Sequence, residues 1–181
     1  MKGDNVLREI EKLAEKQFLP IVGPEKGRIL EKFVKKRKPK TVLEIGTLVG
    51  YSAILITKNL PKDSKLICVE INPRLAEIAR ENISRAGFNN VEVLVGAGKK
   101  VAHSLKEKFD FVFIDALKDE YLDYLHAVED KLNEKAVIIA DNAGVFADAM
   151  EDYLDYVRTS GKYRSKTYYV GGDALEVSVK I

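Results

Sequence analysis

Acidic residues follow two long, largely apolar runs in this chain, at the point where each run ends. Asp115 follows the run Phe109–Ile114, and Asp141 and Asn142 follow the run Val137–Ala140. Runs of this kind are typical of strands buried on both faces, as in parallel sheets. Neighbouring strands lie about 4.8 Å apart, so two carboxylates and an amide meet at one sheet edge if these strands pair. Such a cluster needs a cation or a proton to neutralise it, and oxygen ligands of this type suit Mg²⁺ or Ca²⁺.

A turn that contains Gly46 and Gly50 follows a third apolar run, Thr41–Ile45. Small residues let the backbone approach a ligand, and the N–H groups of the next helix face the same place. Glu70 ends the following apolar run, where an acid can accept both hydroxyls of a ribose. The turn lacks the G-x-G-x-x-G spacing expected for NAD, and Glu44 would repel a pyrophosphate. The pattern therefore favours a ligand with a ribose and no phosphate, such as S-adenosylmethionine. The alternative is a tight turn with Glu70 capping a loop.

The elements that must position these residues alternate along the chain from residue 41 onward. We predict strands at Thr41–Ile45, Leu66–Glu70, Val91–Val95, Phe109–Asp115 and Ala136–Ala140, and a closing hairpin of Tyr163–Tyr169 with Leu175–Ile181. Helices are predicted at Val6–Gln17, Glu25–Lys36, Tyr51–Asn59, Pro73–Ala86, Lys99–Lys106, Asp119–Leu132 and Phe146–Thr159. This alternation predicts an α/β fold, a doubly wound sheet that is mostly parallel. Residues 1–181 are expected to form one domain, with N-terminal helices in 1–40 and a cofactor-binding core in 41–181.

Composition excludes several classes of protein. The chain has 181 residues, of which 46% are hydrophobic, and a net charge of +2. It is thus long enough for a substantial core, too apolar to be disordered and not basic enough to argue for nucleic acid. No apolar run approaches the roughly 20 residues of a membrane helix, and no signal peptide is visible. The single cysteine, Cys68, cannot form an internal disulfide, so we expect a cytoplasmic protein without a membrane partner.

Several of these segments together resemble the metal-dependent O-methyltransferases, the catechol and caffeoyl-CoA type of class I S-adenosylmethionine enzymes. The segments are Val42–Ser52, Val69–Pro73, Gly96-Ala97, Phe113–Lys118, Ala140–Asn142 and, upstream, Val22–Gly27. They occur in the family's order, and the match extends from about Val22 to Ile181. The resemblance implies a Rossmann-like class I methyltransferase fold with a seven-stranded, mostly parallel sheet and an antiparallel C-terminal hairpin.

The resemblance also implies roles for individual residues. The metal ligands would be Asp115, Asp141 and Asn142, holding Mg²⁺ or another divalent cation. S-adenosylmethionine would lie against a set of residues from the matching segments: Val22, Glu44, Gly46, Gly50, Ser52, Glu70, Ile71, Gly96, Ala97 and Asp115. Two adjacent acceptor hydroxyls would reach the metal, which would act as Lewis acid and template.

Three residues are the expected catalytic group. Lys118 lies three residues after Asp115, so it can reach the same oxygen if the chain turns there, and in this family such a lysine serves as general base. Asp115 is shared with the metal site. Glu176 occupies the place where the catechol type has a glutamate that contacts an acceptor hydroxyl; the alternative is an exposed acid on the last strand. The chain has no Trp, so Leu117, Phe146 or Phe18 would have to provide the apolar wall for the acceptor.

The expected reaction is S-adenosylmethionine-dependent, Mg²⁺-dependent methyl transfer to a hydroxyl of a catechol-like small molecule. One alternative keeps the cofactor and changes the acceptor to a hydroxylated uridine of tRNA, for which the basic stretch Lys35–Lys40 would be suited. Another is a non-catalytic nucleotide-binding module, which the complete set of Asp, Lys and Asp-Asn opposes, or an NAD-binding protein, which the spacing of the glycine turn opposes. Relatives of this type are often dimers, so a homodimer is a further expectation.

Overall fold

A sheet of seven strands organises the chain, which the structure, a computed structural model, describes over residues 2–181. The strand order is β3-β2-β1-β4-β5-β7-β6. The five strands from β3 to β5 pair in parallel, and β7 is antiparallel to both β5 and β6. The predicted seven-stranded sheet with an antiparallel C-terminal hairpin is confirmed. The strands are β1 (Thr41–Ile45), β2 (Lys65–Glu70), β3 (Val91–Val95), β4 (Phe109–Ile114), β5 (Leu132–Ala140), β6 (Tyr163–Val170) and β7 (Asp173–Lys180).

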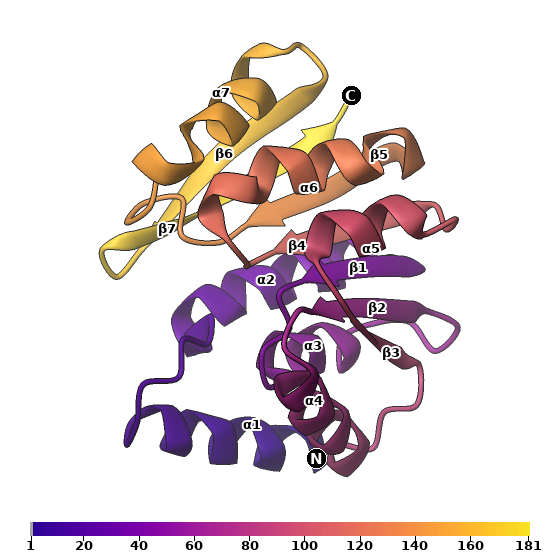
Figure 1. The fold of residues 1–181 in the computed structure, drawn as a ribbon, viewed down its shortest axis with the longest axis vertical. Helices are drawn as coiled ribbons and strands as arrows, with labels where there is room; N and C mark the ends of the chain where they lie inside the picture. The colour runs from indigo at the N-terminus through magenta and orange to yellow at the C-terminus, as the bar shows by residue number, and fades with distance from the viewer. Residues whose placement is uncertain (1) are drawn as a thin grey trace.

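Helices cover both faces of this sheet (Figure 1). The cores on the two faces are distinct: α1 to α4 pack over one face, and α5 to α7 over the other. The helices are α1 (Lys2–Ala14), α2 (Gly23–Arg37), α3 (Tyr51–Thr57), α4 (Pro73–Arg85), α5 (Gly98–Ser104), α6 (Tyr121–Val128) and α7 (Glu151–Thr159). None of those in residues 2–181 is long and apolar enough to cross a membrane.

The continuous apolar strands follow from this double cover. In β1, Val42 contributes to the core beneath α1 to α4, whereas Leu43 and Ile45 contribute to the core beneath α5 to α7. Since successive side chains of a strand point to opposite faces, every position of a strand covered on both sides must be apolar. The exception in β1 is Glu44, which is buried with 0% of its surface exposed and therefore requires a chemical explanation.

Three predicted helices have different bounds in the structure. The first helix runs from Lys2 to Ala14 rather than over 6–17, and the helix predicted over 146–159 begins only at Glu151, after a 3₁₀ turn at Asp148–Met150. The segment predicted as one helix over 119–132 is α6 between two short 3₁₀ turns, Lys118–Glu120 and Glu129–Lys131. Strand β5 begins at Leu132, earlier than predicted. The prediction missed this start because the residues that follow Leu132 are polar.

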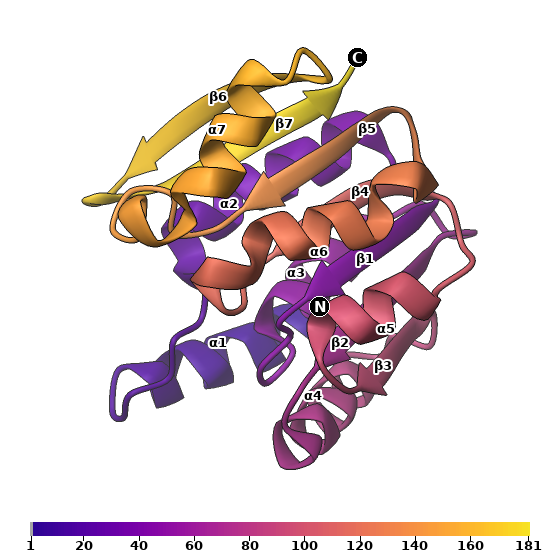
Figure 2. The ribbon, with the colours of Figure 1, turned by 45° about the horizontal axis from the view of Figure 1, so that its top comes forward.

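The C-terminal hairpin reaches the loop that follows β5. Figure 2 shows the turn between β6 and β7 beside that loop. Backbone hydrogen bonding fixes the contact, since Ala143 N donates to Ala174 O at 2.9 Å. The hairpin is thereby placed at the carboxyl end of the parallel strands, where the predicted site residues lie.

Candidate functional site

The carboxyl ends of the parallel strands gather the two acids that follow β4 and β5. Asp115 N donates to Ile45 O of β1, and Asp141 N donates to Ile114 O of β4, each at 2.9 Å. The backbone thus holds Asp115 and Asp141 on adjacent strand ends, as the sequence predicted. Gly46 makes this packing possible, because a Cβ there would lie 2.0 Å from the carbonyl oxygen of Asp115.

Lys118 contacts Asp115 directly. Its Nζ lies 2.9 Å from Asp115 Oδ1 and donates to Tyr121 Oη, also at 2.9 Å. The 3₁₀ turn that begins at Lys118 brings the three side chains together. Tyr121 is fully buried, and burial followed by the charge of Asp115 raises the pKa of its hydroxyl well above the ordinary value. The tyrosine was not predicted, although its place three residues after Lys118 fits one helical turn.

Asp141 contacts a different lysine. Lys26 Nζ of α2 lies 2.5 Å from Asp141 Oδ1 and 2.7 Å from Asp173 Oδ2. Burial, and then the negative charge of Asp115, raise the pKa of Asp141 although Lys26 opposes the shift. The electrostatic cost of placing the partly exposed Asp115 beside the buried Asp141 is therefore present in the structure, and two ammonium groups offset it. Lys26 and Asp173 were not predicted as site residues.

Asn142 has a backbone conformation that few residues adopt, with φ +63°. Asparagine tolerates this left-handed region better than most side chains. Its Nδ2 donates to Asp173 Oδ2 at 2.8 Å, so Oδ1 is the amide atom left to bind a cation. Asp173 Oδ1 also accepts from the backbone N–H groups of Gly144 and Val145. Asp173 therefore fixes both the Asn142 side chain and the loop after it.

The glycine turn surrounds a buried polar atom without a partner. Glu44 Oε2 accepts a hydrogen bond from the Thr47 hydroxyl, whereas Glu44 Oε1 has no hydrogen-bond partner among the described residues. Burial raises the pKa of this carboxyl. An isolated buried acceptor costs free energy, so a donor from a ligand or a water molecule is the natural partner. Gly50 has φ +86° and lies close to α4, where a Cβ would meet Ala79 O at 3.2 Å.

Glu70 at the end of β2 is held by the backbone on both sides. Its Oε2 accepts from Leu48 N and its Oε1 from Asn72 N, each at 2.9 Å. These bonds orient the carboxylate and leave lone pairs for two hydroxyls. Ile71 beside it is 64% exposed, and Gly96 at the end of β3 donates from its N–H to Glu70 O. The predicted ribose acid, apolar residue and third-strand glycine thus lie together.

The remaining predicted cofactor residues lie at the starts of helices. Val22 precedes α2, Ser52 is the second residue of α3, and Ala97 precedes α5. Val22 and Ser52 are buried. Helix starts present unpaired N–H groups, which is consistent with a polar ligand along this edge.

Glu176 is engaged elsewhere. Its carboxylate accepts from Arg158 Nε at 3.0 Å, from Arg158 Nη2 at 2.9 Å and from the Thr167 hydroxyl at 2.5 Å. Among the described residues, its hydrogen bonds and ion pair go to Arg158 and Thr167 and not to Asp115, Lys118 or Asp141. Contact with an acceptor hydroxyl stays a prediction.

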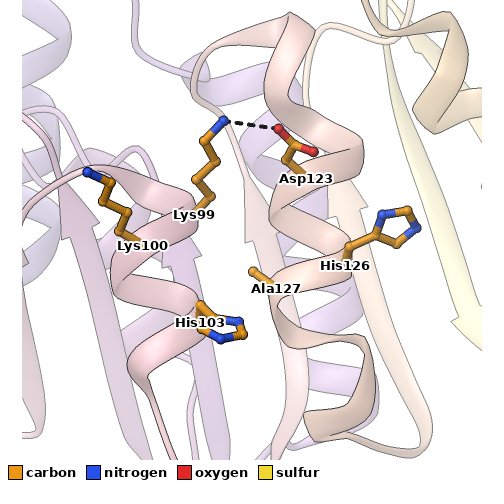
Figure 3. Close-up of a pocket in the computed structure, with 6 residues that line it drawn as sticks. All are labelled: Lys99, Lys100, His103, Asp123, His126 and Ala127. Carbon is orange, nitrogen blue, oxygen red and sulfur yellow. Dashed lines mark hydrogen bonds and ion pairs between the residues drawn. The ribbon is translucent and has the colours of Figure 1, made fainter.

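A surface hollow between α5 and α6 lies apart from this group. It has a volume of about 630 Å³ and contains His103, His126, Lys99, Lys100, Asp123 and Ala127. Figure 3 shows Lys99 paired with Asp123, and the two imidazoles on separate helices. None of the predicted site residues lines it, and His103 and His126 have no role in the candidate site.

The oxygen donors match a hard divalent cation. Among residues 2–181 there is no group of three or more His, Cys, Asp or Glu side chains that could hold a metal ion. The donors brought together are two carboxylates and the amide of Asn142, which Mg²⁺ accepts because it keeps several water or substrate ligands. The orphaned Glu44 Oε1, the oriented Glu70 and the close-packed Gly46 match a ribose-bearing cofactor beside it.

Comparisons with known proteins agree with this geometry. The sequence profile of the O-methyltransferase family matches residues 2–160. Catechol O-methyltransferase B of Danio rerio is 40% identical over 172 residues, covering 87% of this chain and 64% of that protein. Catechol O-methyltransferase of Mus musculus is 34% identical over 163 residues, covering 86% of this chain and 61% of that protein. The chain thus spans about three fifths of the length of these curated relatives.

A solved structure is similar to this chain over its whole fold. The O-methyltransferase from Bacillus cereus in complex with SAH superimposes with a TM-score of 0.88 at 26% identity, covering 98% of this chain and 91% of that one. The similarity therefore includes both the sheet and the helices on its two faces.

Proposed function

Because the chain belongs to the O-methyltransferase family, we propose that it transfers a methyl group from S-adenosylmethionine to a hydroxyl of a catechol-like small molecule. We also propose that Mg²⁺ or another divalent cation binds at Asp115, Asp141 and Asn142. One observation carries the proposal. Lys118 Nζ lies 2.9 Å from Asp115 Oδ1, at the same sheet edge as Asp141, Asn142 and the glycine turn, and this supports a base, a cation site and a ribose site side by side.

The cofactor is assigned to the glycine turn and the ends of β2 and β3. Glu70 would accept the two ribose hydroxyls, because its carboxylate is already oriented by Leu48 N and Asn72 N. Glu44 would take the positively charged amino end of the methionine portion, directly or through water, because its Oε1 lacks a partner among the described residues. Ile71 would pack on the nucleoside with an apolar face that is otherwise exposed.

The chain's own residues prepare the acceptor. When bound, the cation favours the ionised acceptor hydroxyl, and S-adenosylmethionine supplies an electrophilic methyl group on a sulfur that keeps the bonding electrons. Lys118 Nζ acts in this step as the neutral amine, which accepts the hydroxyl proton and becomes the ammonium. Tyr121 Oη holds Nζ from the buried side at 2.9 Å, so the lysine keeps one direction. Asn142, whose amide is fixed by Asp173, would hold the cation through Oδ1. Positioning of this kind supplies much of a transfer enzyme's rate.

Exposed apolar residues near the cluster support an aromatic acceptor. Leu117 follows Asp115 by two residues and is 58% exposed, and Val145 and Phe146 follow Asn142 and are 62% and 46% exposed. Apolar side chains exposed together mark binding surfaces. The two curated relatives give the same indication, since both are catechol O-methyltransferases.

The alternative acceptor, a hydroxylated tRNA base, receives no support from the position of the basic stretch. Lys35–Lys40 ends α2 and leads into the start of β1, whereas the candidate site lies at the carboxyl ends of the strands. The stretch is therefore at the opposite sheet edge, and Lys40 is paired with Asp63. A homodimer stays a prediction from the resemblance.

Transfer of a labelled methyl group to catechol, with and without a chelator, tests the proposal. The Asp141→Ala variant should lose transfer by at least about a hundredfold while its affinity for S-adenosylmethionine in calorimetry stays near that of the wild type. Asp155→Ala, at an exposed position of α7, is the matched control and should keep full activity. Transfer that survives both the chelator and Asp141→Ala contradicts the metal site.

A further inference from the structure

Lys26 has no part in the proposed reaction, yet it is a central cation of the candidate site. It lies in the second turn of α2, and its side chain is only 13% exposed. Its ammonium contacts Asp141 at 2.5 Å and Asp173 at 2.7 Å. Burying a long charged side chain costs conformational entropy and hydration, so this placement requires a reason.

The charge balance of the sheet edge shows what Lys26 does. Each of three acids there has an ammonium partner: Lys118 pairs with Asp115, and Lys26 pairs with both Asp141 and Asp173. The side chain of Asp141 is 2% exposed, so its charge needs a nearby cation. Lys26 supplies the positive charge that a divalent cation at Asp141 would otherwise supply.

The contacts of Asp141 put the ammonium and a bound divalent cation in competition. Asp141 Oδ1 accepts from Lys26 Nζ and from Asn142 N, at 2.5 and 2.7 Å. A divalent cation bound to this carboxylate would lie within a few ångströms of the ammonium, where like charges repel strongly. Asp173 gives the ammonium a second partner, so Lys26 can leave Asp141 without becoming an unpaired buried charge.

We infer that Lys26 is a built-in competitor for the divalent-cation site: it pairs with Asp141 until a cation displaces the ammonium from that carboxylate, and it keeps its contact with Asp173. The inference rests on the proposed metal site and adds a regulatory contact to it. Cation binding then includes the cost of breaking the Lys26–Asp141 ion pair, so the affinity for Mg²⁺ is lower than the oxygen donors alone would give. Cation binding also changes the contacts of α2.

The fold does not depend on this ion pair. Helix α2 is anchored by Leu30 and Val34, which are both fully buried. It also packs closely on α3, because a Cβ at Gly27 would lie 2.8 Å from Leu55 Cδ1. Removal of the Lys26 charge should therefore leave α2 in place.

Titration calorimetry with Mg²⁺ alone tests the inference. Lys26→Met should bind Mg²⁺ about tenfold more tightly than the wild type or better, because one repelling unit charge close to the cation is gone. Lys26→Arg, which keeps the charge, should stay within about threefold of the wild type. Lys58→Met is the matched control, because Lys58 is also a poorly exposed lysine paired with a carboxylate, Glu31 at 2.9 Å, and it should leave the affinity unchanged.

Each outcome of this titration either supports or overturns the inference about Lys26. Weaker or unchanged Mg²⁺ binding by Lys26→Met overturns the inference, and so does equal tightening by Lys58→Met. If the wild type binds Mg²⁺ and Asp141→Ala does not, the proposed function stands even where the Lys26→Met or Lys58→Met result overturns the inference. Absence of binding by both the wild type and Lys26→Met overturns the metal site together with the inference. Thermal unfolding checks that each variant is folded, and Lys26→Gln replaces the Met variant if that one is not.

Discussion

Removal of the guanidinium of Arg158 tests whether the Glu176 carboxylate stabilises the fold or contacts an acceptor hydroxyl. Glu176 is 1% exposed and receives two hydrogen bonds from Arg158 and one from Thr167. The Arg158→Met substitution keeps much of the side-chain length and removes the cation. It leaves a buried carboxylate with only the Thr167 hydroxyl as a partner.

The expected cost follows from the burial of the two partners. Breaking a fully buried ion pair by removing one partner costs about 3 to 5 kcal/mol. Arg158 is itself 42% exposed, so water screens its charge and can reach the vacated place, and we expect a loss of about 2 kcal/mol in the free energy of unfolding. For a domain of this size that corresponds to a fall of about 4 to 8 °C in the unfolding temperature.

Thermal and urea unfolding of the purified variants measure this loss. Glu176→Gln should be milder, because it removes the buried charge together with the ion pair, and it should leave the KM for catechol unchanged if the carboxylate is structural. An unfolding temperature for Arg158→Met within about 1 °C of the wild type refutes the reasoning. A KM that rises in Glu176→Gln at unchanged stability instead supports the acceptor contact predicted from the sequence.

Three further predictions concern single residues. Glu70→Gln should weaken binding of S-adenosylmethionine about tenfold in calorimetry, because hydrogen bonds to a charged acceptor are lost; an unchanged affinity contradicts the ribose assignment. Lys118→Met should lower kcat about a hundredfold or more with little change in cofactor affinity, and a normal kcat would exclude it as the proton acceptor. Burial alone would raise the pKa of Asp110, but hydrogen bonds from Asn133 and from Thr41 N and Lys40 N lower it below the ordinary value. A lowered pKa stabilises the fold above the ordinary value, and the contribution is lost as pH falls through the folded value. Asp110→Asn should therefore lose about 1 to 2 kcal/mol near neutral pH and approach the wild type in acid; a difference in urea unfolding that does not shrink as the pH is lowered below about 4 speaks against this.

The central strands could be predicted because they are apolar at most positions. Thr41–Ile45 matches the observed β1, since cover on both faces leaves an almost continuous apolar run, and the edge strand Val91–Val95 also matches. The start of β5 could not be predicted. Asn133, Glu134 and Lys135 are polar, the register of β5 against β4 shifts beside them, and Lys135 has φ +60°.

The acids of the candidate site could be predicted for the same reason, whereas their partners could not. Asp115 and Asp141 end strands, and the order of parallel strands brings such ends to one edge. Lys26 and Asp173 are 147 residues apart in the sequence, and only the packing of α2 and the β6–β7 turn against the loop after β5 brings them together. The pairing of Glu176 with Arg158 likewise depends on where α7 lies over the sheet, which no local pattern specifies.

Product analysis with two acceptors tests the central claim most directly. Mass spectrometry would follow methyl transfer from S-adenosylmethionine to catechol and to its monomethyl ether, which lacks a vicinal pair of hydroxyls, with chelator present and with Mg²⁺ restored. We expect one methyl group to be added to catechol only when Mg²⁺ is present, and no reaction of the monomethyl ether. Equal methylation of both acceptors, or methylation that persists in the chelator, would contradict a metal site at Asp115, Asp141 and Asn142.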